Sequence, residues 1–204
     1  EVRFCEIMEE YLSHHHVSQE LFKTEMSNLA LYGFGVKSFM LSMIETAIKV
    51  SEGTIGMQAI ERILELGKEL LDKPVELLDG VKDVLKSMSG KYQLVIATKG
   101  DLLDQERKLE KSKLGGYFHH IEIMSDKKES DYLKLIQQLK VEPESFLMIG
   151  NSIKSDMLPV LNIGGNAIHI PFHTTWAHEH VDSDIKKENF KKFENIKDIL
   201  ALMN

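Results

Sequence analysis

The chain has 204 residues, of which 43% are hydrophobic and 28% charged, and its formal net charge at pH 7 is −7. This composition fits one α/β domain with an additional piece, or two small domains, and an acidic chain without a basic cluster is not expected to bind nucleic acid. No apolar run reaches the roughly 18 residues that a membrane-spanning helix needs, and the first residues do not resemble a signal peptide. The single cysteine, Cys5, excludes a disulfide framework, so the expected location is the reducing cytoplasm.

The first part of the chain, up to Lys73-Pro74, carries apolar residues at helical spacing. We expect a helix over residues 4–12, a second helix capped by Ser18, a third over 36–50 and a fourth capped by Thr54. No alternating strand pattern interrupts them. This part is therefore predicted to be a helical domain over residues 1–73.

Strands and helices alternate in the remainder, residues 74–204. Short apolar runs predict strands at 92–97, 121–124, 146–149 and 167–170, and helices are expected at 80–89, 101–113, 130–140, 156–161 and 196–203. Such alternation is typical of a parallel sheet covered by helices on both faces. Ligands of these α/β folds bind beyond the carboxyl ends of the strands.

The first candidate strand end carries Thr98, Lys99 and Gly100. A hydroxyl followed by main-chain N–H groups at the start of a helix can bind an anion. Thr98 could equally serve only to cap the next helix. Both interpretations remain open from these residues alone.

The second strand end carries two adjacent lysines, Lys127 and Lys128. A lysine just beyond a strand can reach a phosphate group and offset its negative charge in a transition state. A solvated Lys-Lys loop is the simpler interpretation when this segment is considered alone.

The third strand end is the most specific. Four apolar residues run into Gly150, and Asn151 and Asp156 follow with a spacing of five. Mg²⁺ prefers hard oxygen ligands, few of them from protein. An aspartate in the first turn of a helix is also stabilised by the helix dipole, which is the structural alternative.

In order and spacing, these segments resemble the haloacid dehalogenase superfamily. Thr98 looks like the hydroxyl of its second motif, Lys127 like the lysine of its third, with Lys128 as a competitor, and residues 150–156 like its fourth. The helical first part resembles the cap of that family. The resemblance implies a Rossmann-like three-layer α/β core with a parallel sheet and an α-helical cap domain.

Two departures from the family pattern stand out. Asn151 occupies a position where the family usually has Asp, which removes one charge from the predicted metal site. The first motif, an apolar strand ending in Asp-x-Asp-x-Thr, does not occur before the cap, and Asp182-Ser183-Asp184 follows polar residues and does not replace it. We therefore expect the nucleophilic aspartate and its strand to lie upstream of Glu1.

The resemblance implies Mg²⁺-dependent hydrolysis of phosphate monoesters through an aspartyl-phosphate. In this scheme Thr98 and Lys127 are catalytic, Lys99, Gly100 and Lys128 bind substrate, and Asp156 and Asn151 bind the metal. The expected partner is a small phosphorylated metabolite, with no nucleic acid or membrane. The alternatives are a metal-independent 2-haloacid dehalogenase, or a non-catalytic phosphate-binding or regulatory module if the natural chain starts at Glu1; monomer and homodimer remain equally open.

Overall fold

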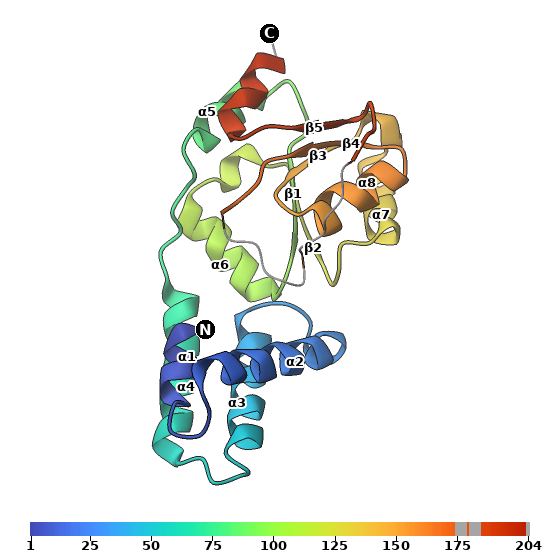
Figure 1. Cartoon of the computed structure of the whole chain (residues 1–204). Helices are drawn as coiled ribbons and strands as arrows, with labels where there is room; N and C mark the ends of the chain where they lie inside the picture. Colours follow the sequence, from blue (N-terminus) through green and yellow to red (C-terminus); the bar gives the residue numbers. More distant parts are fainter. Residues whose placement is uncertain (174–178, 180–184, 203–204) are drawn as a thin grey trace. The chain divides into compact units, whose positions relative to one another are not determined.

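The computed structural model describes residues 1–173, 179 and 185–202 (Figure 1). Asp182-Ser183-Asp184 thus lies outside the described residues. The α-helices are α1 (Val2–Ile7), α2 (His14–Tyr32), α3 (Val36–Val50), α4 (Met57–Asp72), α5 (Val81–Met88), α6 (Leu102–Ser112), α7 (Glu129–Leu139) and α8 (Leu158–Asn162). The strands are β1 (Val95–Lys99), β2 (His120–Met124), β3 (Leu147–Gly150), β4 (Asn166–His169) and β5 (Phe190–Lys192).

The chain forms two compact units. The first comprises Glu1–Val75 together with Lys99–Lys111, and the second comprises Glu76–Thr98 and Ser112–Asn204. The segment Lys99–Lys111, which contains most of α6, is thus grouped with the helical part. The division into domains 1–73 and 74–204 remains a prediction.

The first unit is a group of helices around one hydrophobic core. Apolar stripes of α1 to α4 face each other because each helix places every third or fourth side chain on the same side. The fully buried members of this core include Phe4, Met8, Val17, Met43, Ala47 and Ile63. Between α2 and α3, the buried Asn28 amide donates to Ser42 Oγ at 3.1 Å and to the Glu45 carboxylate at 3.0 Å, which satisfies a polar group inside the helix pair.

The second unit contains the sheets. Strands β3, β4 and β5 pair in parallel, in that order, and β1 pairs with β2. The His119 N–H donates to the Leu94 carbonyl at 2.9 Å directly before β2 and β1, so these two strands also start side by side. Within each of the two groups, β1–β2 and β3–β4–β5, the carboxyl ends of the strands therefore lie at the same edge.

Helices cover both faces of the three-stranded sheet. Met148 and Ala167 pack with residues of α7 and α8, whereas the neighbouring strand residues Ile149 and Ile168 pack with α5 and the 3₁₀ helix Ile196–Leu202. Successive strand side chains point to opposite faces, so the two clusters lie on the two sides of the sheet. The predicted α/β class with parallel strands is confirmed.

Several predicted boundaries were wrong for local reasons. The first helix ends at Ile7, and residues 8–12 form turns, although Tyr11 and Leu12 still pack against the core. Helix α2 begins at His14, five residues earlier than a Ser18 cap would require, and Ser18 lies inside it. Thr54 does not cap α4, which starts at Met57, because its hydroxyl donates to the Ser51 carbonyl at 2.6 Å in the preceding turn.

The C-terminal part also differs in detail. Strand β1 starts three residues later than predicted and includes Thr98 and Lys99. The helix expected at 156–161 starts with a π-helical turn at Ile153, and the last helix is a 3₁₀ helix over the described part of its predicted range, since Met203 lies outside the described residues. Strand β5 was not predicted, because it is three residues long and two of them are lysines.

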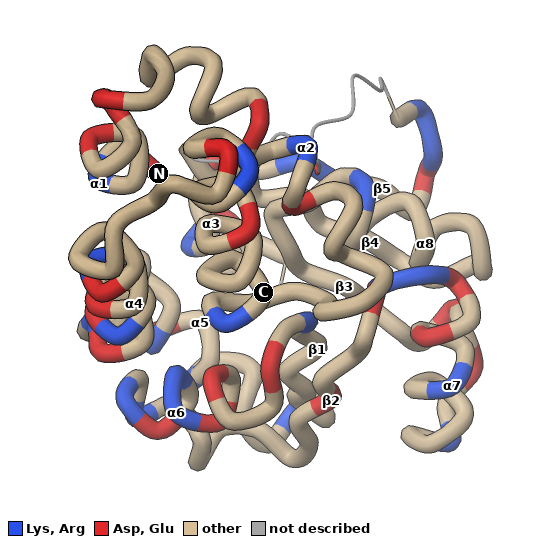
Figure 2. The backbone as a smooth tube through the Cα atoms, turned by 90° about the horizontal axis from the view of Figure 1, so that it is seen from below, with Lys and Arg blue, Asp and Glu red and all other residues tan. Residues whose placement is uncertain are grey.

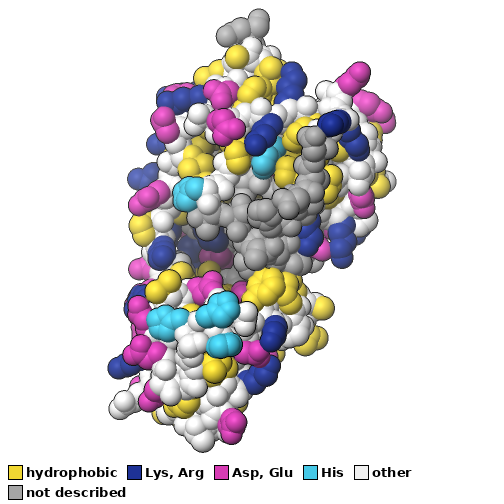
Figure 3. Space-filling model, in the orientation of Figure 1, with side chains coloured by type: hydrophobic (Ala, Val, Ile, Leu, Met, Phe, Trp, Pro, Cys, Tyr) yellow, Lys and Arg dark blue, Asp and Glu magenta, His cyan; other side chains and the backbone are white. Residues whose placement is uncertain are grey.

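The surface carries charges of both signs. Figure 2 shows acidic and basic positions interspersed along α4 and α6, and Figure 3 shows the same mixture over the visible face. Within the described part of the chain, no helix combines the length and the apolar character required to cross a bilayer.

A pair of leucines on α7 tests the core of the second unit. Leu135 is fully buried, whereas Leu133 on the same helix is 46% exposed. We expect Leu135→Ala to lower the free energy of unfolding by about 2–5 kcal/mol because it leaves a cavity. Leu133→Ala should change it by less than about 1 kcal/mol. Urea denaturation measures both, and equal losses would contradict this assignment of the core.

Candidate active site

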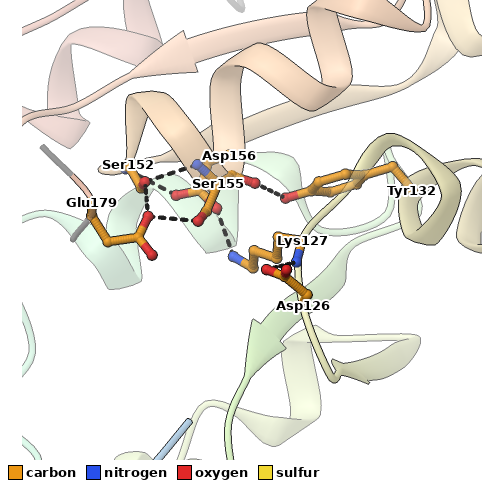
Figure 4. Close-up of polar contacts among 7 residues, drawn as sticks. All are labelled: Asp126, Lys127, Tyr132, Ser152, Ser155, Asp156 and Glu179. Carbon is orange, nitrogen blue, oxygen red and sulfur yellow. Dashed lines mark hydrogen bonds and ion pairs between the residues drawn. The ribbon is translucent and has the colours of Figure 1, made fainter. Parts of the chain in front are cut away.

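The centre of the site is a buried ion pair. Lys127 lies three residues beyond β2, and Asp156 lies in the turn beyond β3. Lys127 Nζ is 2.6 Å from Asp156 Oδ1, and the two side chains are only 10% and 6% exposed (Figure 4). The Asp126 carboxylate accepts the main-chain N–H of Lys127 at 2.8 Å, which helps to orient the segment. The structure thus brings together two residues that are 29 positions apart in the sequence.

The turn after β3 is folded so that Asp156 points back to the strand end. Its second carboxylate oxygen, Oδ2, accepts the Ser152 N–H at 3.0 Å. Gly150, the last residue of β3, lies so close to this carboxylate that a Cβ at position 150 would overlap it. A glycine is therefore required here by a close approach, not by an unusual backbone angle.

Two serines of the same turn connect it to a distant glutamate. Ser152 Oγ accepts the Ser155 N–H at 2.9 Å and donates to Glu179 Oε2 at 2.5 Å. Ser155 Oγ donates to the same Glu179 oxygen at 2.5 Å. Both serines are buried. The Ser-x-x-Ser spacing is visible in the sequence, but nothing local signals Glu179.

Tyr132 of α7 supports the turn from another side. Its hydroxyl donates to the Ser155 carbonyl at 3.0 Å, and the residue is fully buried. Burial, followed by the negative charge of Asp156, raises the pKa of the Tyr132 phenol well above its usual value, so Tyr132 remains a neutral donor. The sequence predicts Tyr132 only as part of a helix.

His169 binds the start of the turn. It ends β4, where it lies beside Gly150 of β3, and its Nε2 is 3.0 Å from the Asn151 carbonyl oxygen. Because a carbonyl can only accept, Nε2 carries the proton. Asn151 itself is exposed. Its backbone is thus anchored in the site, and its predicted role as a metal ligand remains a prediction.

The two candidate lysines differ in their environment. The Lys128 side chain is 71% exposed and its ammonium is 3.2 Å from Asp126 Oδ2, in contrast to the buried Lys127. Lys128 also directly precedes α7, and the Asp131 carboxylate accepts its main-chain N–H at 3.2 Å. This geometry favours Lys127 as the lysine of the site.

The residues at the end of β1 belong to different compact units, Thr98 to the second and Lys99 to the first. Thr98 is half-buried, near the end of β1 in the second unit. In the first unit, Lys99 Nζ lies 3.9 Å from the centre of the Phe34 ring, a cation–π contact. Gly100 follows with a φ of +135°, which favours glycine. The neighbouring Asp101 forms an ion pair of 3.0 Å with Lys37, and this ammonium lowers the pKa of the Asp101 carboxyl group.

The donor chemistry of the site fits a magnesium ion. The Asp156 carboxylate is a hard oxygen ligand at a strand end, and Mg²⁺ uses one or two protein carboxylates with water and phosphate oxygens completing its shell. Within the described residues, no group of three or more His, Cys, Asp or Glu is arranged to hold a metal. Asp156 would therefore need further oxygen ligands to complete a metal site.

The comparisons with known proteins agree with this geometry. The sequence matches the family model of the haloacid dehalogenase-like hydrolases over residues 11–170. A solved haloacid dehalogenase-like family hydrolase from Xanthomonas campestris is 34% identical, with a TM-score of 0.86, and the match covers 99% of this chain and 82% of that chain. This chain belongs to the haloacid dehalogenase-like hydrolases.

More distant structures share the fold of this hydrolase family. A 2-haloacid dehalogenase from Pseudomonas syringae pv. Tomato is 15% identical, with a TM-score of 0.59 and coverage of 91% of this chain and 80% of that chain. A HAD phosphatase from Thermococcus onnurineus is also 15% identical, with a TM-score of 0.60 and coverage of 98% and 86%. No curated protein matches the chain significantly. The family is therefore shown, and the same fold occurs in both a phosphatase and a dehalogenase.

The buried ion pair gives a stability prediction. Lys127→Met should lower the free energy of unfolding by about 3–5 kcal/mol, because it leaves the Asp156 carboxylate buried without its cation. The matched variant Lys128→Met removes an exposed charge and should change it by less than about 1 kcal/mol. Urea denaturation measures both values. Similar values for the two variants would show that the pair is not buried in solution.

Proposed function

We propose that this haloacid dehalogenase-like hydrolase is a Mg²⁺-dependent phosphatase that cleaves phosphate monoesters through an aspartyl-phosphate. The observation that carries the proposal is the buried Lys127–Asp156 pair at the strand ends. A phosphatase needs a fixed cation for the phosphoryl oxygens and a carboxylate for the metal, and this pair supplies both. A reducing cytoplasm, consistent with a single cysteine, is part of the proposal.

Lys127 would bind the transferred phosphoryl group. An ammonium has three N–H donors, so Lys127 can donate to a phosphoryl oxygen while it stays paired with Asp156. Its low exposure strengthens this interaction, because few water molecules screen the charge. The Thr98 hydroxyl would donate to another phosphoryl oxygen from the end of β1.

Asp156 would hold the metal, with Asn151 as a second oxygen ligand. Bound Mg²⁺ would neutralise negative charge on the phosphoryl group. The Ser152 N–H keeps the Asp156 carboxylate oriented, and the packing of Gly150 against it limits its movement. Both features favour a preorganised ligand over a mobile surface carboxylate.

The nucleophilic aspartate is proposed to lie on a strand upstream of Glu1. Val95 and Ala97 of β1 pack in the same hydrophobic cluster as Met148 of β3. Within the described residues, however, the group β1–β2 and the group β3–β4–β5 are not hydrogen-bonded to each other. A further strand between β1 and β3 would connect the two groups and bring its carboxyl end to Lys127 and Asp156.

Substrate contacts are proposed at Lys99, Gly100 and Lys128. Lys99 and Gly100 directly follow Thr98, and both residues are partly exposed. The exposed Lys128 would attract a phosphorylated substrate and not act in the chemical step. A small phosphorylated metabolite is the substrate class that these cations suit.

The proposal is tested with the protein extended upstream through the strand that precedes Glu1. We expect hydrolysis of p-nitrophenyl phosphate with Mg²⁺ and loss of at least about 100-fold in rate with EDTA, because the metal offsets transition-state charge. Halide release from 2-chloropropionate that survives EDTA would instead identify a dehalogenase. Turnover of neither substrate, with the upstream aspartate intact, would leave a non-catalytic phosphate-binding module.

Variants of the same protein test the assigned roles. Asp156→Asn keeps the shape of the side chain but removes its charge, so it should lower Mg²⁺-dependent turnover by about 100-fold or more while the circular dichroism spectrum stays unchanged. Lys127→Ala should cost more activity than Lys128→Ala, since only Lys127 is buried in the site. An unchanged kcat for Asp156→Asn at saturating Mg²⁺ would remove Asp156 from the mechanism.

A further inference from the structure

Glu179 is a part of the site to which the proposed function assigns no role. Figure 4 shows its carboxylate directed at the turn that carries Asp156. Oε2 accepts both serine hydroxyls, from Ser152 and Ser155, at 2.5 Å each. Glu179 is half-buried and is 23 residues away from Asp156 in the sequence.

The bonds form a short chain from Glu179 to Asp156. The Ser152 hydroxyl already accepts the Ser155 N–H, so its single hydrogen is directed to Glu179. The Ser152 N–H donates in turn to Asp156 Oδ2. Asp156 Oδ1 then receives the Lys127 ammonium. Each link fixes the orientation of the next one.

Glu179 Oε2 is the common acceptor of two hydroxyl donors. This arrangement calls for an oxygen acceptor at this point, and hydrogen bonds to an ionised acceptor are shorter and stronger than neutral ones. Ser152 and Ser155 are buried, so loss of their common acceptor would allow the hydroxyls to rotate and the turn to loosen.

We propose that Glu179 is a positioning residue, which acts through the Ser152 and Ser155 hydroxyls to keep the Asp156 carboxylate aimed at Lys127. The expected loss of turnover without Glu179 rests on the proposed phosphatase function, whereas the expected loosening of the turn does not. Glu179 touches neither the reacting atoms nor the metal in this proposal.

Amide hydrogen exchange of the turn tests the proposal independently of activity. Glu179→Ala should raise the exchange rate of the Ser152 and Asp156 N–H groups by about tenfold, the effect of losing roughly one hydrogen bond. Glu179→Gln should restore slow exchange, because its amide oxygen can accept both hydroxyls. Glu188→Ala, at an exposed position, is the control and should leave the exchange unchanged. Unchanged exchange in Glu179→Ala overturns the proposal.

Kinetics of the upstream-extended protein separate positioning from metal binding. Glu179→Ala should lower kcat by about 10- to 100-fold, the usual effect of removing a residue that orients a ligand. The KM for p-nitrophenyl phosphate should change little, and Glu179→Gln should recover most of kcat. If Glu179→Gln is as impaired as Glu179→Ala, and calorimetry shows weakened Mg²⁺ binding, Glu179 is a metal ligand and the positioning role is wrong.

Ser155→Ala provides a test that does not alter Glu179. It should reproduce part of the Glu179→Ala defect, and the double variant should be no worse than about the more impaired single variant, because both act through the same contact. Additive losses would show that Glu179 works by another route. A wild-type protein without turnover, but with faster exchange in Glu179→Ala, would refute the phosphatase function alone.

Discussion

The buried pair between Lys127 and Asp156 is the interaction on which the rest of the site depends. Removing both charges from water is costly, and their mutual attraction compensates only when further hydrogen bonds satisfy them. The surroundings meet this requirement. The Ser152 N–H donates to the second oxygen of the Asp156 carboxylate, and the main-chain N–H of Lys127 donates to Asp126. A pair with this support is typical of a functional site, because hydrophobic residues would stabilise the fold at lower cost.

The turn after β3 is stabilised by residues from several elements. Tyr132 comes from α7, His169 from the end of β4, and Glu179 from the segment that follows β4. Tyr132 binds the Ser155 carbonyl, and His169 binds the Asn151 carbonyl. Glu179 binds the hydroxyls of the two serines in the turn. The placement of Asp156 therefore depends on several elements of the second unit, and the sequence around Asp156 does not provide it alone.

In the first unit, charged and aromatic side chains gather beside the loop between α2 and α3. Phe34 and Lys37 contact Lys99 and Asp101, and Gly35 approaches the Asp101 N–H so closely that a Cβ there would be tightly packed. These contacts link the loop between α2 and α3 to the residues that follow Thr98.

Hydrophobic periodicity determined most of the fold. Helix α3 spans the predicted residues, and β2 and β4 lie within one residue of their predicted ranges, because an apolar stripe or run is a local property of the chain. The helix starts at Ser18 and Thr54 were predicted wrongly, because these hydroxyls find partners elsewhere. The family, with Thr98, Lys127 and Asp156 as candidates, was also accessible from the order and spacing of short motifs.

Tertiary structure decided what local patterns do not contain. The sequence favours Lys127 over its neighbour Lys128 only by the order and spacing of motifs, whereas packing buries Lys127 against Asp156 and leaves Lys128 exposed. Tyr132, His169 and Glu179 carry no local signal of function, because their partners lie between 18 and 27 residues away. The sequence by itself therefore determined the elements, the family and the candidate residues, whereas the folded chain decided which charges meet, since burial and hydrogen bonding depend on contacts between distant segments.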